Sequence, residues 1–169
     1  MQESEVDKKS IKINFHRYSN EAINFLNKFE KVTYVSTLLV EDNILSAHQS
    51  NGYADWDKKF YYDGKYRDSL LIKLGLELTK IEEGDKKTII WDDVLRNHPE
   101  NEIDKQRRAH NIYHGVSFIY GLTDNISMAI NVCTDSATTK REFEDLILPH
   151  RINLLNIFQE LYCLQRSFL

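Results

Sequence analysis

Aromatic and polar side chains gather between residues 53 and 68 in a pattern that could form a ligand site. Trp56 and Phe60 are four residues apart, so they share one face if this segment is helical. A small amphiphilic ligand requires an apolar wall with a few N–H, O–H and carboxylate groups, and this segment has them. The alternative is that the aromatic residues only fill the core. The candidate ligand-binding residues are Tyr53, Trp56, Phe60, Tyr66, Asp68 and, further along the chain, Trp91.

Patterns for catalysis and metal binding are weak. His110 and His114 have the spacing of a metal pair on a helix, but no catalytic glutamate lies between them and no third ligand is evident. Asp55 and Asp57 lack the glycine and terminal glutamate of a calcium loop. The sequence has no phosphate-binding loop and no nucleophile elbow. We therefore expect no cofactor, no metal site and no enzymatic activity.

Charged residues cluster after Pro99, where we expect a helix over residues 100–113 that ends with Gly115 as its cap. The acids precede the bases, an order that complements the helix dipole. We interpret them as helix-stabilising charges rather than as a site. They are Glu100, Glu102 and Asp104, followed by Lys105, Arg107 and Arg108.

The composition is that of one globular domain of 169 residues, with 41% hydrophobic and 28% charged residues. Its net charge of −4 argues against a general nucleic-acid-binding surface on this chain. There is no apolar run long enough to span a membrane and no secretory signal, so we expect a cytoplasmic protein. In that compartment Cys133 and Cys163 are expected to be buried free thiols.

The elements that must position these residues begin with a helix and a hairpin. Residues 1–18 are expected to form a polar N-terminal extension, followed by a helix over residues 19–29. The segments 32–40 and 44–49 are rich in β-branched residues and flank a turn, which predicts two paired strands. A long helix is expected over residues 138–165, kinked or split at Pro149.

The clearest strand pattern lies at residues 126–132, which form a second hairpin with residues 116–120. Apolar and small or polar residues alternate strictly, so they occupy opposite faces of a sheet. The short side chains of the small face leave space above the sheet, and either a closely packed helix or a cavity must occupy that space. Hairpin-length connections favour an antiparallel sheet and an α+β fold. The apolar face has Ile126, Met128, Ile130 and Val132, and the small face has Ser127, Ala129 and Asn131.

The order of these motifs resembles the autoinducer-binding domain of LuxR-type transcription regulators. The resemblance covers about residues 31–165. Phe60 stands where that family has a tyrosine, and Ser69 stands where it has a proline. The motifs that carry the resemblance are Trp56-x3-Phe60, Asp68 about a dozen residues later, Trp91, Gly115 before the last hairpin, and Leu148-Pro149 in the final helical region.

The resemblance implies a PAS/GAF-like α/β/α sandwich with a central antiparallel sheet of about five strands. The signal would lie between the sheet and one helical layer. Trp56 would donate to a carbonyl of the ligand head group and Asp68 would accept from its amide. Trp91 would close over the head group. The remaining contacts would come from the small face, Ser127, Ala129 and Asn131.

The sequence therefore predicts a sensing domain over residues 19–169. We expect it to bind an acyl-homoserine lactone or another small amphiphile and to control DNA binding by a helix-turn-helix domain or a partner. No such DNA-binding domain is expected in this chain. The last helix is expected to pair two copies, or one copy with a full-length regulator, through Leu154, Leu161, Tyr162 and Leu164. The alternative is a PAS/GAF-like interaction module with a filled core that binds no small ligand.

Overall fold

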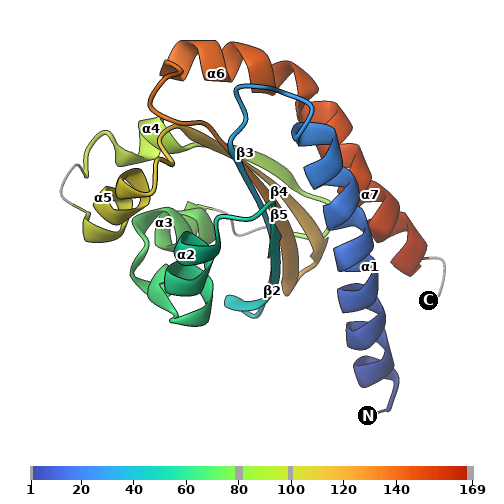
Figure 1. Ribbon diagram of the computed structural model, residues 1–169. Coiled ribbons are helices and arrows are strands. Elements are labelled where there is room, and N and C mark those ends of the chain that lie inside the picture. Colours follow the sequence, from blue (N-terminus) through green and yellow to red (C-terminus); the bar gives the residue numbers. More distant parts are fainter. Residues whose placement is uncertain (1, 79–81, 99–100, 167–169) are drawn as a thin grey trace.

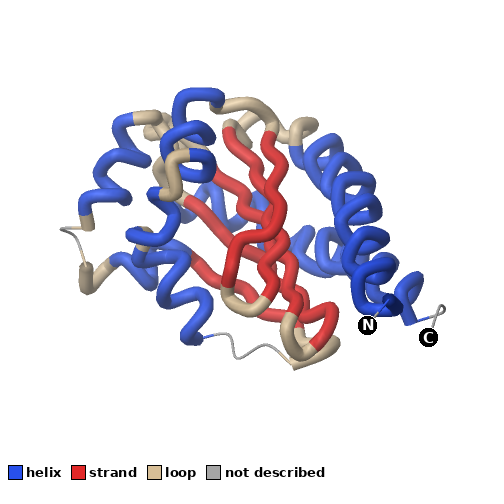
Figure 2. Tube along the Cα trace, turned by 90° about the horizontal axis from the view of Figure 1, so that it is seen from below, coloured by secondary structure: helices blue, strands red, loops and turns tan. Residues whose placement is uncertain are grey.

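The computed structural model describes residues 2–78, 82–98 and 101–166. Five antiparallel strands form one sheet in the order β2-β1-β5-β4-β3. Helices cover both faces of this sheet, so the expected α/β/α arrangement of the α+β class is confirmed (Figures 1 and 2). The strands are β1 (Tyr34–Glu41), β2 (Ile44–Ser50), β3 (Lys86–Ile90), β4 (Gly115–Thr123) and β5 (Ile126–Cys133).

Both expected hairpins are present. The turn between β1 and β2 consists of Asp42 and Asn43, with φ angles of 50° and 65°. Tight two-residue hairpin turns favour residues such as Asp and Asn that tolerate positive φ. The second hairpin pairs β4 with β5, and β5 also pairs with β1, which places β5 at the centre of the sheet.

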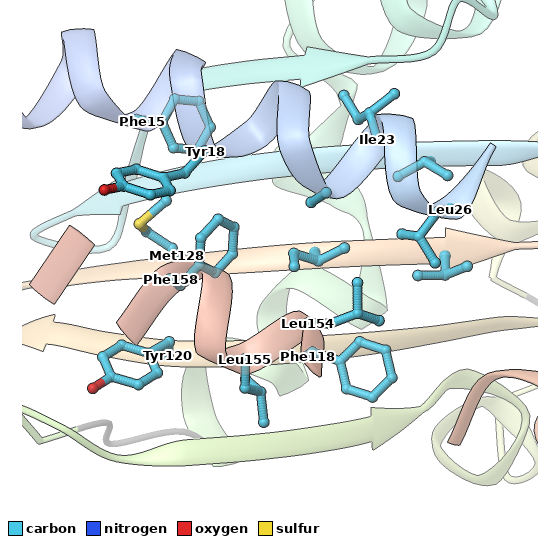
Figure 3. Close-up of a cluster of buried hydrophobic side chains, with 14 of the residues drawn as sticks. Phe15, Tyr18, Ile23, Leu26, Phe118, Tyr120, Met128, Leu154, Leu155 and Phe158 are labelled. Atoms are coloured by element: carbon cyan, nitrogen blue, oxygen red, sulfur yellow. The ribbon is translucent and has the colours of Figure 1, made fainter. Parts of the chain in front are cut away.

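One face of the sheet is covered by α1 (Gln2–Leu26) and α7 (Arg151–Arg166), which lie side by side (Figure 1). The apolar face of β5 packs against them to form the main core (Figure 3). Burial of these side chains is the main source of stability, at about 25 cal/mol for each Å² of apolar surface. The core includes Phe15, Leu26, Phe118, Met128, Leu154 and Phe158.

The expected start of the first helix was wrong. The helix begins at Gln2 and not at residue 19, so it includes the segment that was expected to precede it as an extension. Ile11, Phe15 and Tyr18 recur at intervals of four and three residues and lie buried in the core. The part of α1 from Ile11 to Tyr18 therefore belongs to the domain.

The C-terminal helical region divides as Pro149 predicts. α6 (Lys140–Ile147) is followed by a 3-10 turn (Leu148–His150) and then by α7. Leu154 and Leu161 are fully buried against the sheet, so the expectation that they form a pairing surface was wrong. The side chains of residues 162 and 164, also expected there, lie outside the described residues.

The second helical layer consists of shorter elements on the opposite face of the sheet (Figure 1). Cys133, at the end of β5, is a buried free thiol on this side. Cys163, which was expected to be buried as well, is exposed. The elements of this layer are α2 (Ala54–Asp57), a π-helical turn (Lys58–Tyr62), a 3-10 turn (Lys65–Asp68), α3 (Leu70–Leu78), α4 (Trp91–Leu95) and α5 (Glu102–Ala109).

Two further details differ from expectation. α5 ends at Ala109, four residues earlier than expected, and Glu100 lies outside the described residues. Gly115 does not cap this helix but is the first residue of β4. In the described part of the chain, no helix combines the length and the apolar composition needed to cross a membrane.

Candidate functional site

The floor of the site is the small-residue face of the central strands. Asn131 of β5 lies between Ser36 of β1 and Ser117 of β4 in the register of the sheet. One row further along, Ala129 lies between larger residues of the same two strands, Leu38 and Ile119. Short side chains at the centre of this face leave space below the second helical layer.

A cavity of about 100 Å³ occupies this space, between the sheet and the layer formed by α2 to α5. Apolar side chains line most of it, including the buried rings of Trp56 and Phe60. Those two rings are stacked with a centroid separation of 4.9 Å and an angle of 20°. Apolar cavities of about 150 Å³ take up benzene, so this cavity is near the size that admits a small organic group.

The polar groups of the floor form a continuous chain of hydrogen bonds. The indole N–H of Trp91 donates to Ser117 Oγ at 2.7 Å, and Ser117 Oγ donates to Asn131 Oδ1 at 2.6 Å. Asn131 Nδ2 donates to Ser36 Oγ at 3.1 Å, and the Tyr61 hydroxyl donates to the same oxygen at 3.2 Å. Each of these donors already has an acceptor, so the floor is stable without a ligand.

A second polar contact joins β1 and β2 to α2 at Tyr34, which lines the cavity. The Tyr34 hydroxyl donates to Asp57 Oδ1 at 2.6 Å, and Ser50 Oγ donates to Asp57 Oδ2. Burial raises the pKa of the Tyr34 hydroxyl well above its ordinary value, and burial likewise raises the pKa of the Tyr61 hydroxyl. Both tyrosines therefore remain protonated donors under physiological conditions.

The side of the cavity beside α5 carries a buried ion pair. Arg107 Nε lies 3.6 Å from Asp104 Oδ1, and the two side chains are only 4% and 8% exposed. Arg107 Nη1 donates to the carbonyl of Tyr113 at 3.0 Å, and the guanidinium carbon lies 4.6 Å from the centroid of the Trp91 ring. Arg107 is thus held by three contacts, one of them with Asp104.

This ion pair is incompletely satisfied. Arg107 Nε, Arg107 Nη2 and Asp104 Oδ2 are buried without a hydrogen-bond partner among the described residues. Burial raises the pKa of the Asp104 carboxyl and lowers the pKa of the Arg107 guanidinium, because both charged forms have lost water. Unpaired buried polar atoms are unfavourable in an empty cavity and are suited to a polar ligand.

The structure brings five of the predicted site residues to the cavity wall. Trp56 and Phe60 contribute from the second helical layer, and Trp91 contributes from the start of α4. Ser127 and Ala129 contribute from β5, on the face that the alternation predicts.

Three predicted residues lie elsewhere. Tyr53 packs edge-to-face on Tyr34, with ring centroids 5.2 Å apart. Tyr66 lines a smaller adjoining pocket of about 20 Å³. Asp68 is exposed at the end of the 3-10 turn and does not line the cavity. This placement does not support the expected contact between Asp68 and a ligand in the cavity.

The sequence analysis missed Asp104 and Arg107 as cavity residues. A weak signal was present, because Ile103 is an apolar residue one helical turn before Arg107 and the two therefore share a face of α5. Arg108, on the adjacent face, is exposed. The hydroxyl groups of Ser36 and Ser117, which belong to the cavity floor, were also missed.

The two histidines at helical spacing do not form a pair. His110 Nδ1 lies 2.9 Å from the carbonyl of Gln106, and His114 Nδ1 lies 3.0 Å from an oxygen of Asp92. Across residues 2–78, 82–98 and 101–166, no group of three His, Cys, Asp or Glu side chains is placed to hold a metal ion.

No protein-family model and no curated protein sequence matches this chain. Solved structures do match. A crystal structure of Escherichia coli SdiA aligns with a TM-score of 0.51 and 16% identity, over 89% of this chain and 61% of that one. The structure of SdiA in complex with octanoyl-rac-glycerol aligns with a TM-score of 0.53 and 14% identity, over 89% of this chain and 60% of that one.

The solution structure of E. coli SdiA residues 1–171 aligns with a TM-score of 0.57 and 13% identity, over 92% of this chain and 83% of that one. This chain thus spans about three fifths of the two longer SdiA structures. At such low identities the likeness concerns the fold alone. The chain therefore has the α+β fold of the N-terminal region of SdiA.

Proposed function

We propose that this chain is the small-molecule-sensing domain of a LuxR-type transcription regulator. The observation that carries the proposal is the largely apolar cavity over the small-residue face of β5. SdiA, whose N-terminal fold this chain shares, is a LuxR-family regulator, and one of its structures contains octanoyl-rac-glycerol. The proposed ligand is an acyl-homoserine lactone or another small amphiphile, held by Trp56, Phe60, Trp91, Ser127 and Ala129.

In this proposal, ligand binding controls a DNA-binding helix-turn-helix domain or a partner that carries one. A ligand that binds only the folded state stabilises it, by about 2.7 kcal/mol at a hundredfold excess over the dissociation constant. That stabilisation orders the domain for contact with a second copy or with a full-length regulator, in the cytoplasm. A strictly monomeric mass by light scattering at high concentration, with and without ligand, would remove the pairing from the proposal.

The test is mass spectrometry of organic extracts from the purified protein, combined with thermal unfolding against acyl-homoserine lactones and monoacylglycerols. We expect either a co-purifying amphiphile or a rise of several degrees in Tm. Ala129→Phe, which fills the cavity, should abolish that rise, and Ala129→Ser, which leaves the space open, should retain it. Equal responses from the two variants would place the ligand outside this cavity.

The alternative is a PAS/GAF-like interaction module with a filled core. It requires the aromatic residues to pack together without leaving space above Ala129. The cavity at that position favours the sensing proposal. A complete absence of extracted molecules and of thermal shifts would favour the alternative.

A further inference from the structure

The buried polar groups of the floor and of α5 fall into two sets. Those of the floor, such as Ser117 and Asn131, are hydrogen-bonded to one another. Those of α5 are not, because three buried atoms of Asp104 and Arg107 lack partners among the described residues. Both side chains line the cavity. Among these buried groups, the unmet hydrogen-bonding demand of the protein therefore lies on α5 and not on the floor.

The unpartnered atoms determine which hydrogen-bond donors and acceptors a ligand must have. Arg107 Nε and Nη2 are donors and require acceptors, whereas Asp104 Oδ2 is an acceptor and requires a donor. One ligand head group meets both requirements if it has an ester or amide carbonyl oxygen and, a few bonds away or on the amide itself, an O–H or N–H donor. The i, i+3 spacing of the two residues on α5 holds the donors and the acceptor close together.

The charge of the site restricts the ligand further. Arg107 and Asp104 neutralise each other, so the buried pair has no net charge. A carboxylate ligand would leave one uncompensated negative charge beside Asp104, and burying such a charge is costly. A neutral ligand adds hydrogen bonds without adding charge.

We propose that Asp104 and Arg107 form the head-group site of this cavity and bind an uncharged head group that has an ester or amide carbonyl oxygen together with a hydroxyl or N–H donor. This inference rests on the proposed sensing function. It assigns the polar contact to α5, in place of the exposed Asp68, and excludes fatty acids and other carboxylates as preferred ligands.

The experiment compares ligands that share a tail and differ in head-group charge. Monoacylglycerols with butanoyl, hexanoyl and octanoyl chains are titrated against the full chain by calorimetry, each beside the fatty acid of equal length. We expect the wild type to bind at least one monoacylglycerol about ten- to hundredfold more tightly than its fatty acid, because the acid leaves a buried charge uncompensated. Equal or tighter binding of the fatty acid overturns the proposal.

Two variants then test the residues. Asp104→Asn removes the negative charge with little change in shape, so the preference should move at least about tenfold towards the fatty acid. Arg107→Gln should weaken both ligands. Matched controls on the same helix are Glu102→Gln and Arg108→Gln, at exposed positions, which should leave both affinities unchanged. If Arg107→Gln does not fold, the Asp104→Asn comparison decides alone.

The outcomes separate this inference from the proposed function. Tight monoacylglycerol binding that is the same in wild type, Asp104→Asn and Arg107→Gln overturns the head-group site and leaves the sensing function intact. Binding by neither class of ligand at any chain length overturns the head-group site; if extraction yields no amphiphile and the acyl-homoserine lactones also fail to bind, the sensing function is overturned as well.

Discussion

Gly115 of β4 lies directly against the indole ring of Trp91. A β-carbon on residue 115 would come within 2.3 Å of Trp91 Cε3, a distance at which something must move. The same indole donates to Ser117 Oγ and lies beneath the guanidinium of Arg107. The absence of a side chain at residue 115 therefore sets the position of a ring that links the floor of the cavity to the ion pair.

Gly115→Ala should displace Trp91 and break its hydrogen bond to Ser117. Overpacking of a well-filled site costs about 1–3 kcal/mol, and we expect a loss of that size in urea unfolding together with a changed tryptophan emission spectrum. In a Trp91→Leu background the same substitution should cost much less, because the ring that it strikes is gone. An equal cost in both backgrounds would show that the two residues are not coupled.

Phe15→Ala should destabilise the protein by about 3–5 kcal/mol, because the side chain of Phe15, on α1, is fully buried in the core. Ile13→Ala is the matched control, two residues away and 63% exposed, and should change stability by less than about 0.5 kcal/mol. The free energy of unfolding in urea measures both. Similar small effects would mean that α1 before residue 19 does not contribute to the core.

Asp68→Asn should leave both the stability and the response to ligand unchanged, within about 0.5 kcal/mol, since this side chain is exposed and outside the cavity. The measurement is the ligand-induced change in Tm for the variant and the wild type. Loss of the response would indicate that the 3-10 turn moves inward when the ligand binds.

His48 should make stability depend on pH. Its ring stacks on Tyr61 at 4.1 Å, and burial lowers the pKa of the imidazole below its ordinary value. The unfolded chain therefore takes up this proton at a higher pH than the folded protein, so stability is lost as the pH falls through about 6.5. His48→Phe keeps the stacking and should flatten the curve of unfolding free energy between about pH 7.5 and pH 5.5. His98→Phe, at an exposed position, should not; a curve for His48→Phe as steep as that of wild type would exclude His48 as the source.

The sheet could be predicted because its signals are local. The alternation over residues 126–132 identified the two faces of β5, and the polar turn at Asp42 and Asn43 marked the first hairpin. Pro149 divided the last helical region because it removes a backbone donor wherever it stands in a helix. Each of these signals depends on neighbours in the sequence alone.

The rest depended on contacts between distant segments. Apart from Ile103 one turn earlier, nothing local distinguishes Arg107, which is buried, from Arg108, which is exposed; the direction in which α5 packs makes the difference. The acid beside the cavity is Asp104 and not Asp68 for the same reason. The helical spacing of Ile11, Phe15 and Tyr18 is present in the sequence, but the charged residues around them favoured the interpretation as a polar extension.

β5 is hydrogen-bonded on both sides, and its successive residues face the core and the cavity in turn. A substitution series from residue 126 to residue 132 would therefore produce two interleaved signals with a period of two residues. Even-numbered positions, such as Met128 and Ile130, would register as losses of stability. Odd-numbered positions, such as Ala129, would register as changes in ligand response, so one strand maps both properties of the domain.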